Sequence, residues 1–397
     1  KELRPNIYCK GQDYKFLKND TTGEIKNEMN ALIKVGGKIV YTKGPIFSSS
    51  SLINKFVKVH SDKQKTIIEK IKKRYSFFEI KNKIESFKKL KVLVIGETII
   101  DQYVFCSALG KSGKEPMLAL KDIKTEQYLG GAAAIARHIS PFCGKITLLS
   151  MLGEKKEFLK EVKNSLPKNV RFDYINKKNS PTIVKKRFLD HVSNNKVLGV
   201  YKINYDYLTK NDEKIFSKKL SKLISVHDVV IVSDYGHGLM SEKSSKFICK
   251  KSKYLALNAQ INAANLGYHS MKKYKNFDFF INNEAEIRHE MRDIKSKTEA
   301  LIKKLSSQQN IKNLIVTSGK EGALIYNKKE NKFNSCAAFA ETALDKVGAG
   351  DAMLSITALC LKNKFSRDLS LLIGSLAAAQ STETFGNKHA VNKIKIL

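Results

Sequence analysis

A segment near the C-terminus combines glycines with carboxylates in a way that suits phosphoryl chemistry. It runs from Asp345 to Asp351, reads DKVGAGD, and leads into an apolar stretch with helical periodicity, Ala352 to Leu361. With two glycines around one alanine, the backbone can turn sharply and approach a ligand closely. A helix that begins here directs its unpaired N–H groups and the positive end of its dipole toward an anion. The Asp351 carboxylate then lies where it can remove a proton from a hydroxyl that attacks a phosphoryl group.

The simpler interpretation of the same segment is a tight turn that Asp351 caps, since short glycine motifs recur by chance. In the functional interpretation, Asp351 is the general base, and three backbone N–H groups contact the transferring group. These belong to Gly348, Ala349 and Gly350. The other polar motifs of the chain decide between the two interpretations.

Size and charge narrow the classes of protein to consider. The 397 residues exceed one small core and favour two or more domains. A formal net charge of +34 and a pI near 9.7 raise nucleic-acid binding as one class. Because the excess is mostly lysine spread over the whole length, we interpret it as a solvated surface that also attracts phosphorylated metabolites. Nucleic acid remains the minor alternative.

The cysteine spacing and the hydropathy indicate whether the chain is a metal-binding, disulfide-bonded or membrane protein. The six cysteines lie far apart, without a Cys-x-x-Cys pair or paired histidines, which argues against a zinc site or a disulfide framework. No apolar run reaches the roughly 18 residues of a membrane span, and no signal peptide opens the chain. We therefore expect a cytoplasmic protein with reduced thiols and no membrane partner.

Polar residues follow several segments that read as buried strands. Residues 91–96 form a nearly continuous apolar run, and Asp101 lies just beyond it, near the edge where open α/β sheets bind ligands. The pair Gly130 and Gly131 precedes a helical segment and permits close approach of a substrate. Asn283 and Glu286 lie three residues apart at a strand-to-helix junction. They either face a ligand together or form a capping box.

In their order along the chain, these motifs resemble the ribokinase (PfkB) family of carbohydrate kinases. The resemblance extends from about Lys91 to the C-terminus and is strongest to the kinase half of bifunctional heptose-phosphate kinase/adenylyltransferases, the ADP-heptose synthases. It implies an α/β fold with a mostly parallel central sheet flanked by helices, and a small β-lid that includes residues 103–128, 181–189 and 197–203. It also implies a kinase that uses ATP and Mg²⁺, acts on a sugar or sugar phosphate, and forms a homodimer through the lid.

The resemblance assigns roles residue by residue. The expected sugar-side residues are Asp101, Gly130, Gly131, Asp234 and His237. Two basic strand residues, Lys185 and Arg187, are expected to meet a phosphate already on the sugar, with solvated strand charges as the equal alternative. Asn283 and Glu286 are expected to organise hydrated Mg²⁺. The expected nucleotide-side residues are Thr317, Gly319, Gly322 and Asn387.

Four positions depart from the pattern of the family. Ala134 stands where asparagine is usual, His237 where lysine is typical, and Ser318 where arginine is frequent. Asn258 stands at the start of a usual Asp-Pro-Lys. These departures leave open a second interpretation, in which the chain is a non-catalytic module that binds a sugar or a nucleotide.

The N-terminal region is expected to belong to a different domain. Within residues 1–57, the segments at residues 4–6, 10–14 and 48–51 resemble the C-terminal half of cytidylyltransferase-like nucleotidyltransferases, whose catalytic histidine motif has no match here. We expect this part alone not to transfer nucleotides. Residues 58–90 read as an amphipathic helical connector, and residues 91–397 as the kinase domain.

Overall fold

The computed structural model describes residues 4–10, 25–42, 60–262, 265–340 and 343–397. These fall into two compact units, Lys1–Asp62 and Lys63–Leu397. In the first unit, β1 (Ile7–Lys10) and β2 (Lys38–Tyr41) pair in parallel, and α1 (Ile25–Ile33) connects them in the chain. The described part of this unit therefore has the order strand, helix, strand. The predicted motifs at residues 11–14 and 48–51 lie outside the described residues.

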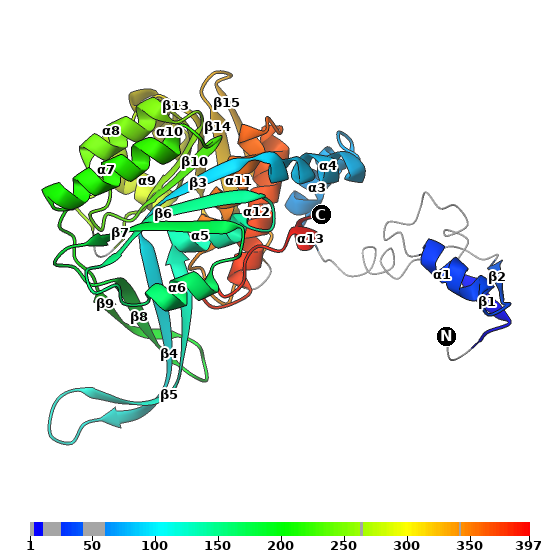
Figure 1. Ribbon diagram of the computed structural model, residues 1–397, viewed down its shortest axis with the longest axis horizontal. Helices are drawn as coiled ribbons and strands as arrows, with labels where there is room; N and C mark the ends of the chain where they lie inside the picture. Colours follow the sequence, from blue (N-terminus) through cyan, green and yellow to red (C-terminus); the bar gives the residue numbers. More distant parts are fainter. Residues whose placement is uncertain (1–3, 11–24, 43–59, 263–264, 341–342) are drawn as a thin grey trace. The chain divides into compact units, whose positions relative to one another are not determined.

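The second unit is built on a nine-stranded sheet with the order β15-β14-β13-β12-β11-β10-β3-β6-β7 (Figure 1). Strands from β13 through β7 pair in parallel, and the β14–β15 hairpin adds an antiparallel edge. The parallel strands are β3 (Lys91–Gly96), β6 (Lys145–Gly153), β7 (Val170–Lys177), β10 (Val229–Asp234), β11 (Leu255–Ala259), β12 (Phe277–Asn283) and β13 (Ile311–Thr317). The edge strands are β14 (Ala323–Asn327) and β15 (Lys332–Cys336).

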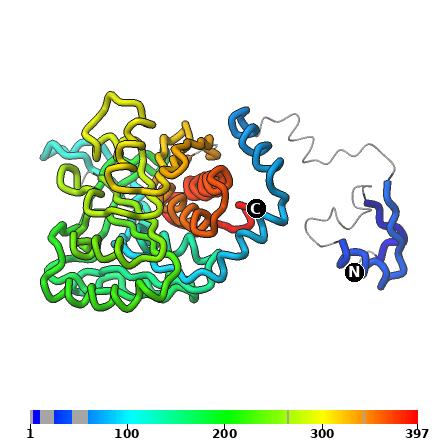
Figure 2. The backbone as a smooth tube through the Cα atoms, turned by 90° about the horizontal axis from the view of Figure 1, so that it is seen from above, coloured from blue at the N-terminus to red at the C-terminus, as the bar shows by residue number. Residues whose placement is uncertain are grey.

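Helices cover both faces of this sheet, which is why its central strands are continuously apolar. One face carries α5 (Ala132–Ile139), α6 (Leu159–Ser165), α11 (Ala349–Lys362) and α12 (Arg367–Thr382). The other carries α7 (Lys210–Ile224), α8 (Glu242–Lys251), α9 (Glu284–Met291) and α10 (Thr298–Gln309). Helices α11 and α12 pack side by side (Figure 2), and the chain ends in α13 (Lys393–Ile396). Short 3₁₀ turns lie at Met271–Lys273 (η4) and Gly319–Glu321 (η5).

A separate four-stranded sheet, which we call the lid, has the order β5-β4-β8-β9. Its strands are β4 (Thr98–Lys111), β5 (Leu118–Gly131), β8 (Ile183–Asp190) and β9 (Lys196–Lys202). The chain passes from β3 into β4 with only Glu97 between them, so the lid begins at the carboxyl edge of the main sheet. The predicted ribokinase-like architecture of a parallel sheet, flanking helices and β-lid is confirmed.

Two helices precede β3 in the chain and pack against the core of the second unit. They are α3 (Asp62–Lys72) and α4 (Phe77–Glu85), and the short turn η3 (Ser86–Lys89) follows them. Ile71, Ile84 and Phe87 are buried in the same apolar cluster as α11 and α12. The Phe87 ring stacks on Phe365 at a centroid distance of 5.3 Å. No helix among the described residues is both long and apolar enough to cross a membrane.

We predict that Phe87→Ala destabilises the second unit by about 3 kcal/mol, because a fully buried ring leaves a cavity. Urea unfolding followed by circular dichroism measures this change. Phe78→Ala is the matched control, since the Phe78 side chain is 62% exposed and should change stability by less than about 0.5 kcal/mol. Equal midpoints for the two variants would contradict the packing described for these helices.

Candidate active site

Asp351 lies in the first turn of α11, as predicted. Gly348 precedes this helix with φ of +93°, a left-handed conformation that glycine adopts without strain. The Ala349 N–H makes only a long contact of 3.4 Å to the Lys346 carbonyl. The N–H groups at the start of a helix have no partners within the helix, so this turn can receive an anion.

The Asp351 carboxylate is held in a state suited to accepting a proton. Burial, together with the charge of Asp101, raises its pKa to about 7. A hydrogen bond from the Tyr235 hydroxyl to Oδ1, 2.7 Å long, and the charge of Lys185 both oppose this rise. A base with a pKa near neutrality is deprotonated often enough at pH 7 and still accepts a proton readily.

Asp345 opens the same loop and fixes it to the lid. Its buried carboxylate accepts hydrogen bonds from the Tyr103 hydroxyl (2.6 Å), the Lys196 ammonium, and the N–H groups of Val347 (3.1 Å) and Gly386 (3.0 Å). Burial would raise the pKa of Asp345, but these donors hold it below its usual value. Tyr103 belongs to β4 and Lys196 to β9, so two lid strands meet the Asp345–Asp351 loop, the expected catalytic loop, at one carboxylate.

The expected sugar-side residues of β4 and β5 come together. The Asp101 carboxylate is almost fully buried and pairs with Arg187 at 2.5 Å. A Cβ on Gly130 would lie 2.2 Å from Asp101 Oδ2, so only glycine allows this carboxylate its position. A Cβ on Gly131 would lie 2.3 Å from the Glu97 carbonyl oxygen. These contacts explain the paired glycines, and a sugar-binding role stays a prediction.

The two basic residues of β8 differ in their surroundings. Arg187 is already paired with Asp101. Lys185 is 7% exposed, forms no ion pair with a described residue, and places Nζ 5.5 Å from the centre of the Tyr235 ring. Burial lowers the pKa of Lys185, while the charges of Asp101, Glu97 and Asp351 favour its charged form. Of the two, Lys185 is the cation that remains available to an anionic substrate.

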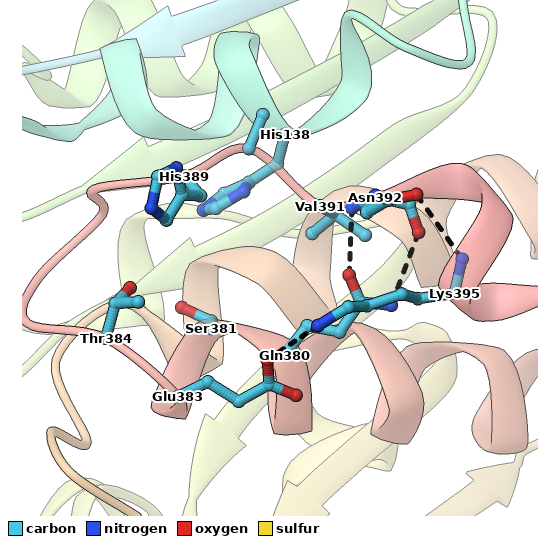
Figure 3. A pocket seen from close by; sticks show the side chains of 10 residues that line it. His138, Gln380, Ser381, Glu383, Thr384, His389, Val391, Asn392 and Lys395 are labelled. Carbon is cyan, nitrogen blue, oxygen red and sulfur yellow. Dashed lines mark hydrogen bonds and ion pairs between the residues drawn. The ribbon is translucent and has the colours of Figure 1, made fainter.

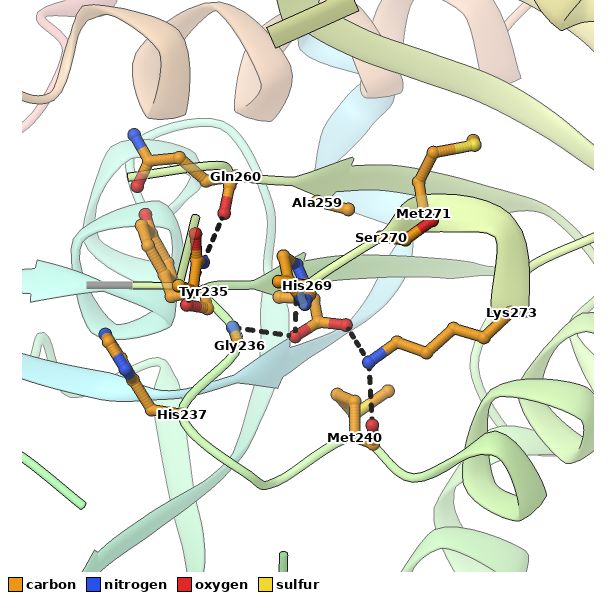
Figure 4. A network of polar contacts seen from close by, with 12 residues as sticks. Tyr235, Gly236, His237, Met240, Ala259, Gln260, His269, Ser270, Met271 and Lys273 are labelled. Carbon is orange, nitrogen blue, oxygen red and sulfur yellow. Dashed lines mark hydrogen bonds and ion pairs between the residues drawn. The ribbon is translucent and has the colours of Figure 1, made fainter. Parts of the chain in front are cut away.

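The Asp234 carboxylate forms hydrogen bonds with other groups of the protein. It accepts hydrogen bonds from Lys273 (2.7 Å) and from the Gly236 N–H (3.0 Å) (Figure 4). The Tyr274 hydroxyl donates another hydrogen bond, 2.8 Å long. This arrangement anchors the turn that carries Tyr235 and His237. Asp234 therefore positions the turn, and substrate contact by its side chain stays a prediction.

His237 takes no part in the polar contacts drawn around Asp234 (Figure 4). Its side chain is fully buried, and neither ring nitrogen has a hydrogen-bond partner among the described residues. Burial, followed by the charges of Lys185 and Lys177, lowers the pKa of His237 to about 3. The ring is therefore neutral at pH 7, with one donor and one acceptor nitrogen.

Asn283 and Glu286 form the capping box that the spacing allowed. The Glu286 N–H donates to the Asn283 side chain at 2.9 Å, and Glu286 Oε2 accepts from the Asn283 N–H at 2.9 Å. Burial raises the pKa of Glu286 to about 7, and the Asp351 charge adds to the rise. Two carboxylates that destabilise each other's charge create a site where a cation is favourable. Asn283 and Glu286 offer the oxygen atoms that Mg²⁺ prefers. Both Glu286 oxygens already accept backbone N–H groups, Oε1 from Ile261 at 3.2 Å, so the magnesium role stays a prediction.

The expected nucleotide-side residues lie at two places. Thr317 ends β13 opposite Asn283, and Gly319 and Gly322 shape the turn that follows, with φ of +57° and +94°. Asn387 is buried behind the catalytic loop, where a Cβ on Gly348 would lie 2.2 Å from Asn387 Oδ1. Asn387 therefore supports the loop, and direct nucleotide contact is a prediction that no observation here tests.

Two residues of the site were not among the predicted ones. Tyr235 binds Asp351, and Glu97 accepts N–H groups of Tyr235 (3.0 Å) and His237 (3.2 Å). Burial and the charge of Asp234 raise the pKa of Glu97 to about 7. A glutamate directly after a buried strand was a usable signal for Glu97. For Tyr235 no local signal existed, because its partner lies far along the chain.

Comparisons with known proteins agree on the fold and the family. A family model described as pfkB family carbohydrate kinase matches residues 89–394. The bifunctional protein HldE of Campylobacter jejuni (strain RM1221) is 25% identical over 309 residues, which cover 76% of this chain and 63% of HldE. An uncharacterized sugar kinase of Buchnera aphidicola is 26% identical and is covered over 96% of its length. The chain thus spans less than two thirds of the HldE relatives it matches.

Solved structures show the same fold at low identity. Phosphofructokinase-2 from Escherichia coli, in complex with potassium, superposes with a TM-score of 0.62 at 14% identity, over 77% of this chain and 97% of that one. A ribokinase from Arabidopsis thaliana, complexed with ribose and ATP, gives a TM-score of 0.58 at 16% identity, over 77% and 97%.

We predict that Lys196→Met loosens the catalytic loop, because Asp345 loses a charged donor worth about 1–3 kcal/mol. Amide hydrogen exchange over residues 346–351 should become roughly tenfold faster or more. Lys202→Met, on the same strand, is the matched control, since Lys202 pairs with Glu157 at 3.6 Å. Unchanged exchange in Lys196→Met, or an equal change in both variants, would refute the connection between lid and loop.

Proposed function

Since the chain belongs to the pfkB family of carbohydrate kinases, we propose that it transfers the γ-phosphoryl group of ATP to a hydroxyl of a sugar or sugar phosphate. The observation that carries this proposal is the Asp351 carboxylate, with its pKa raised to about 7, at the start of a helix in a site shared with Asp101 and Glu286.

In the proposed reaction, Asp351 removes the proton of the attacking hydroxyl. The N–H groups at Gly348, Ala349 and Gly350 stabilise the negative charge of the transferring group in a site that excludes water. Asp101 accepts hydrogen bonds from sugar hydroxyls and pairs with Arg187. Asn283 and Glu286 would hold hydrated Mg²⁺, which neutralises phosphate charge when bound.

We further propose that the sugar already carries a phosphate, as in a heptose phosphate. The support is Lys185, a buried residue near the charges of Asp101 and Asp351 that forms no ion pair with a described residue. The name of the HldE relatives, a bifunctional protein, suggests that this activity is paired with another. Residues 1–57 would then be the end of a nucleotidyltransferase domain, residues 58–90 the connection and residues 91–397 the kinase, in a protein that makes nucleotide-activated sugars.

A homodimer through the lid is part of the same proposal. Several apolar side chains of the lid strands are about half exposed: Leu118, Ile123, Leu198 and Val200. Exposed apolar surface of this kind favours protein–protein contact. Sedimentation of the protein as a monomer at all concentrations would oppose this part.

A non-catalytic binding module is the second candidate. It is favoured by His237, whose neutral ring replaces the lysine of the family motif. A calorimetric screen that finds sugar or nucleotide binding, together with no ADP release, would support it over the kinase.

We predict that Asp351→Asn lowers kcat by about 10²–10⁴-fold, the usual contribution of a general base, and leaves ATP binding nearly unchanged. Coupled-enzyme detection of ADP measures turnover, and calorimetry measures binding. Asp122→Asn in the exposed lid hairpin is the matched control and should retain full activity. Retained turnover in Asp351→Asn would exclude this carboxylate as the base.

We predict that Tyr235→Phe shifts the acidic limb of the kcat/KM profile to higher pH. The base acts when deprotonated, so activity is lost as pH falls through its pKa. Tyr235 lowers the pKa of Asp351 by hydrogen bonding, and its loss must raise that pKa above about 7. Tyr205→Phe should leave the limb in place. A shift to lower pH in Tyr235→Phe would contradict the assignment.

A further inference from the structure

Tyr103 of β4 contacts both the sugar-side residues and the catalytic loop, and the proposed reaction gives it no role. Side chains along a strand alternate between the two faces of a sheet, so Asp101 and Tyr103, two residues apart, lie on the same face of β4. The Tyr103 side chain is fully buried, and its hydroxyl donates to Asp345 Oδ2 at 2.6 Å, across 242 residues of sequence. A buried tyrosine hydroxyl that finds its partner this far along the chain fixes two segments to each other.

On the sugar side, an ion pair lies against the Tyr103 ring. Arg187 is opposite Tyr103 in the pairing of β8 with β4 and reaches back to Asp101, with Nη1 2.5 Å from Oδ1. The guanidinium carbon lies 5.5 Å from the centre of the Tyr103 ring, within the range of a cation–π contact. Because the ion pair uses Oδ1 of Asp101, Oδ2 can accept a hydrogen bond from a sugar hydroxyl while the pair stays in place.

On the loop side, the Tyr103 hydroxyl and the Gly386 N–H both donate to Asp345 Oδ2. Gly386 packs so closely that a Cβ there would lie 2.9 Å from a carbon of the Tyr103 ring. Burial raises the pKa of Tyr103, and the charges of Asp101 and Asp345 add to the rise, so the hydroxyl remains a donor at pH 7. Asp345 Oδ1 accepts the Val347 N–H, which carries the restraint into the loop.

The Gly348 end of the loop is supported from another side. Asn387 Oδ1 packs against Gly348 and lies 3.0 Å from Nε2 of His138. His138 also lines a cavity, together with Gln380 and Val391 among others (Figure 3). None of the residues that line this cavity belongs to the lid, so this second support does not pass through the Asp101–Arg187 pair.

We propose that Tyr103 is a positioning residue, which sets the Asp345–Asp351 loop at a fixed place relative to the Asp101–Arg187 pair. A sugar that binds Asp101 also restrains Arg187, and through the Tyr103 ring it restrains the loop. Such a restraint matters because a misplacement of about 1 Å between reacting groups can cost 10²-fold in rate. That it serves phosphoryl transfer rests on the proposed function, while the fixing of the loop itself does not.

Tyr103→Phe tests the proposal, because it keeps the buried ring and removes only the hydroxyl. Without sugar, amide hydrogen exchange over residues 346–351 should become roughly tenfold faster, since Asp345 loses a buried donor. With the sugar that gives the highest ADP production, kcat should fall by about 10–10²-fold, while KM for the sugar and for ATP stays nearly unchanged. A role in packing alone would lower stability without this division between kcat and KM. The same sugar should slow loop exchange in the wild type and not in Tyr103→Phe.

Tyr128→Phe is the matched control. The Tyr128 ring lies next to that of Tyr103, with 5.8 Å between the centres, but its hydroxyl donates to Glu126 of its own strand. Removal of this hydroxyl should leave both kcat and loop exchange unchanged.

Unchanged loop exchange in Tyr103→Phe, or an equal change in both variants, would overturn the proposal. A wild-type kcat in Tyr103→Phe would overturn it too, as would sugar that slows loop exchange equally in Tyr103→Phe and the wild type. The proposed kinase function fails in a different way, because no sugar would then give ADP with the wild-type protein. Loop exchange measured without sugar would still decide whether Tyr103 fixes the loop.

Discussion

The site depends on one constraint: several carboxylates are buried away from water at one edge of the sheet. Burial raises the pKa of Asp351, Glu286 and Glu97 to about 7 each, although each of these side chains also accepts hydrogen bonds that favour its charged form. Keeping these carboxylates ionised is costly, because burial disfavours their charge and each has one carboxylate neighbour that also raises its pKa: Asp101 for Asp351, Asp351 for Glu286 and Asp234 for Glu97. The same cost makes the site receptive to protons and cations, which general-base catalysis with a metal nucleotide requires.

Hydrogen-bond donors of the protein hold the buried carboxylates in place. Tyr235 holds Asp351, Arg187 holds Asp101, and the N–H groups of the β10 turn hold Glu97. Asp345 extends the same principle to the lid, because its four donors come from two lid strands and from the loop segments around it. A lid that is bonded to the catalytic loop can couple substrate enclosure to the position of the N–H groups.

Local pattern was sufficient to predict the strand at 91–96 and the helix after DKVGAGD, because apolar runs and glycine act within a few residues. The mostly parallel sheet and the lid were expected from the resemblance to the family. The edge hairpin β14–β15 was not predicted, because half-buried edge strands lack a continuous apolar run. The capping box of Asn283 and Glu286 was left as an alternative, and the structure contains it.

The sequence alone could not predict which side chains of distant segments pair. The pairing of Arg187 with Asp101 depends on β8 lying in register beside β4, and Tyr235 meets Asp351 only after β10 and α11 are packed. The Asp234 side chain illustrates the same limit: its motif did not indicate that Lys273 and Tyr274 both bind its Oδ2, and substrate contact by this side chain stays a prediction. Long-range contacts of this kind are set by the tertiary fold, which no single motif encodes.

The central claim is that phosphoryl transfer occurs at Asp351. It is tested most directly by following a radiolabelled γ-phosphoryl group of ATP in the presence of Mg²⁺ and a panel of free and phosphorylated sugars. The account predicts that the label moves into a sugar product with the wild-type chain, and that transfer is almost lost with Asp351→Asn. Label that stays in ATP or appears only as inorganic phosphate with every sugar would contradict it.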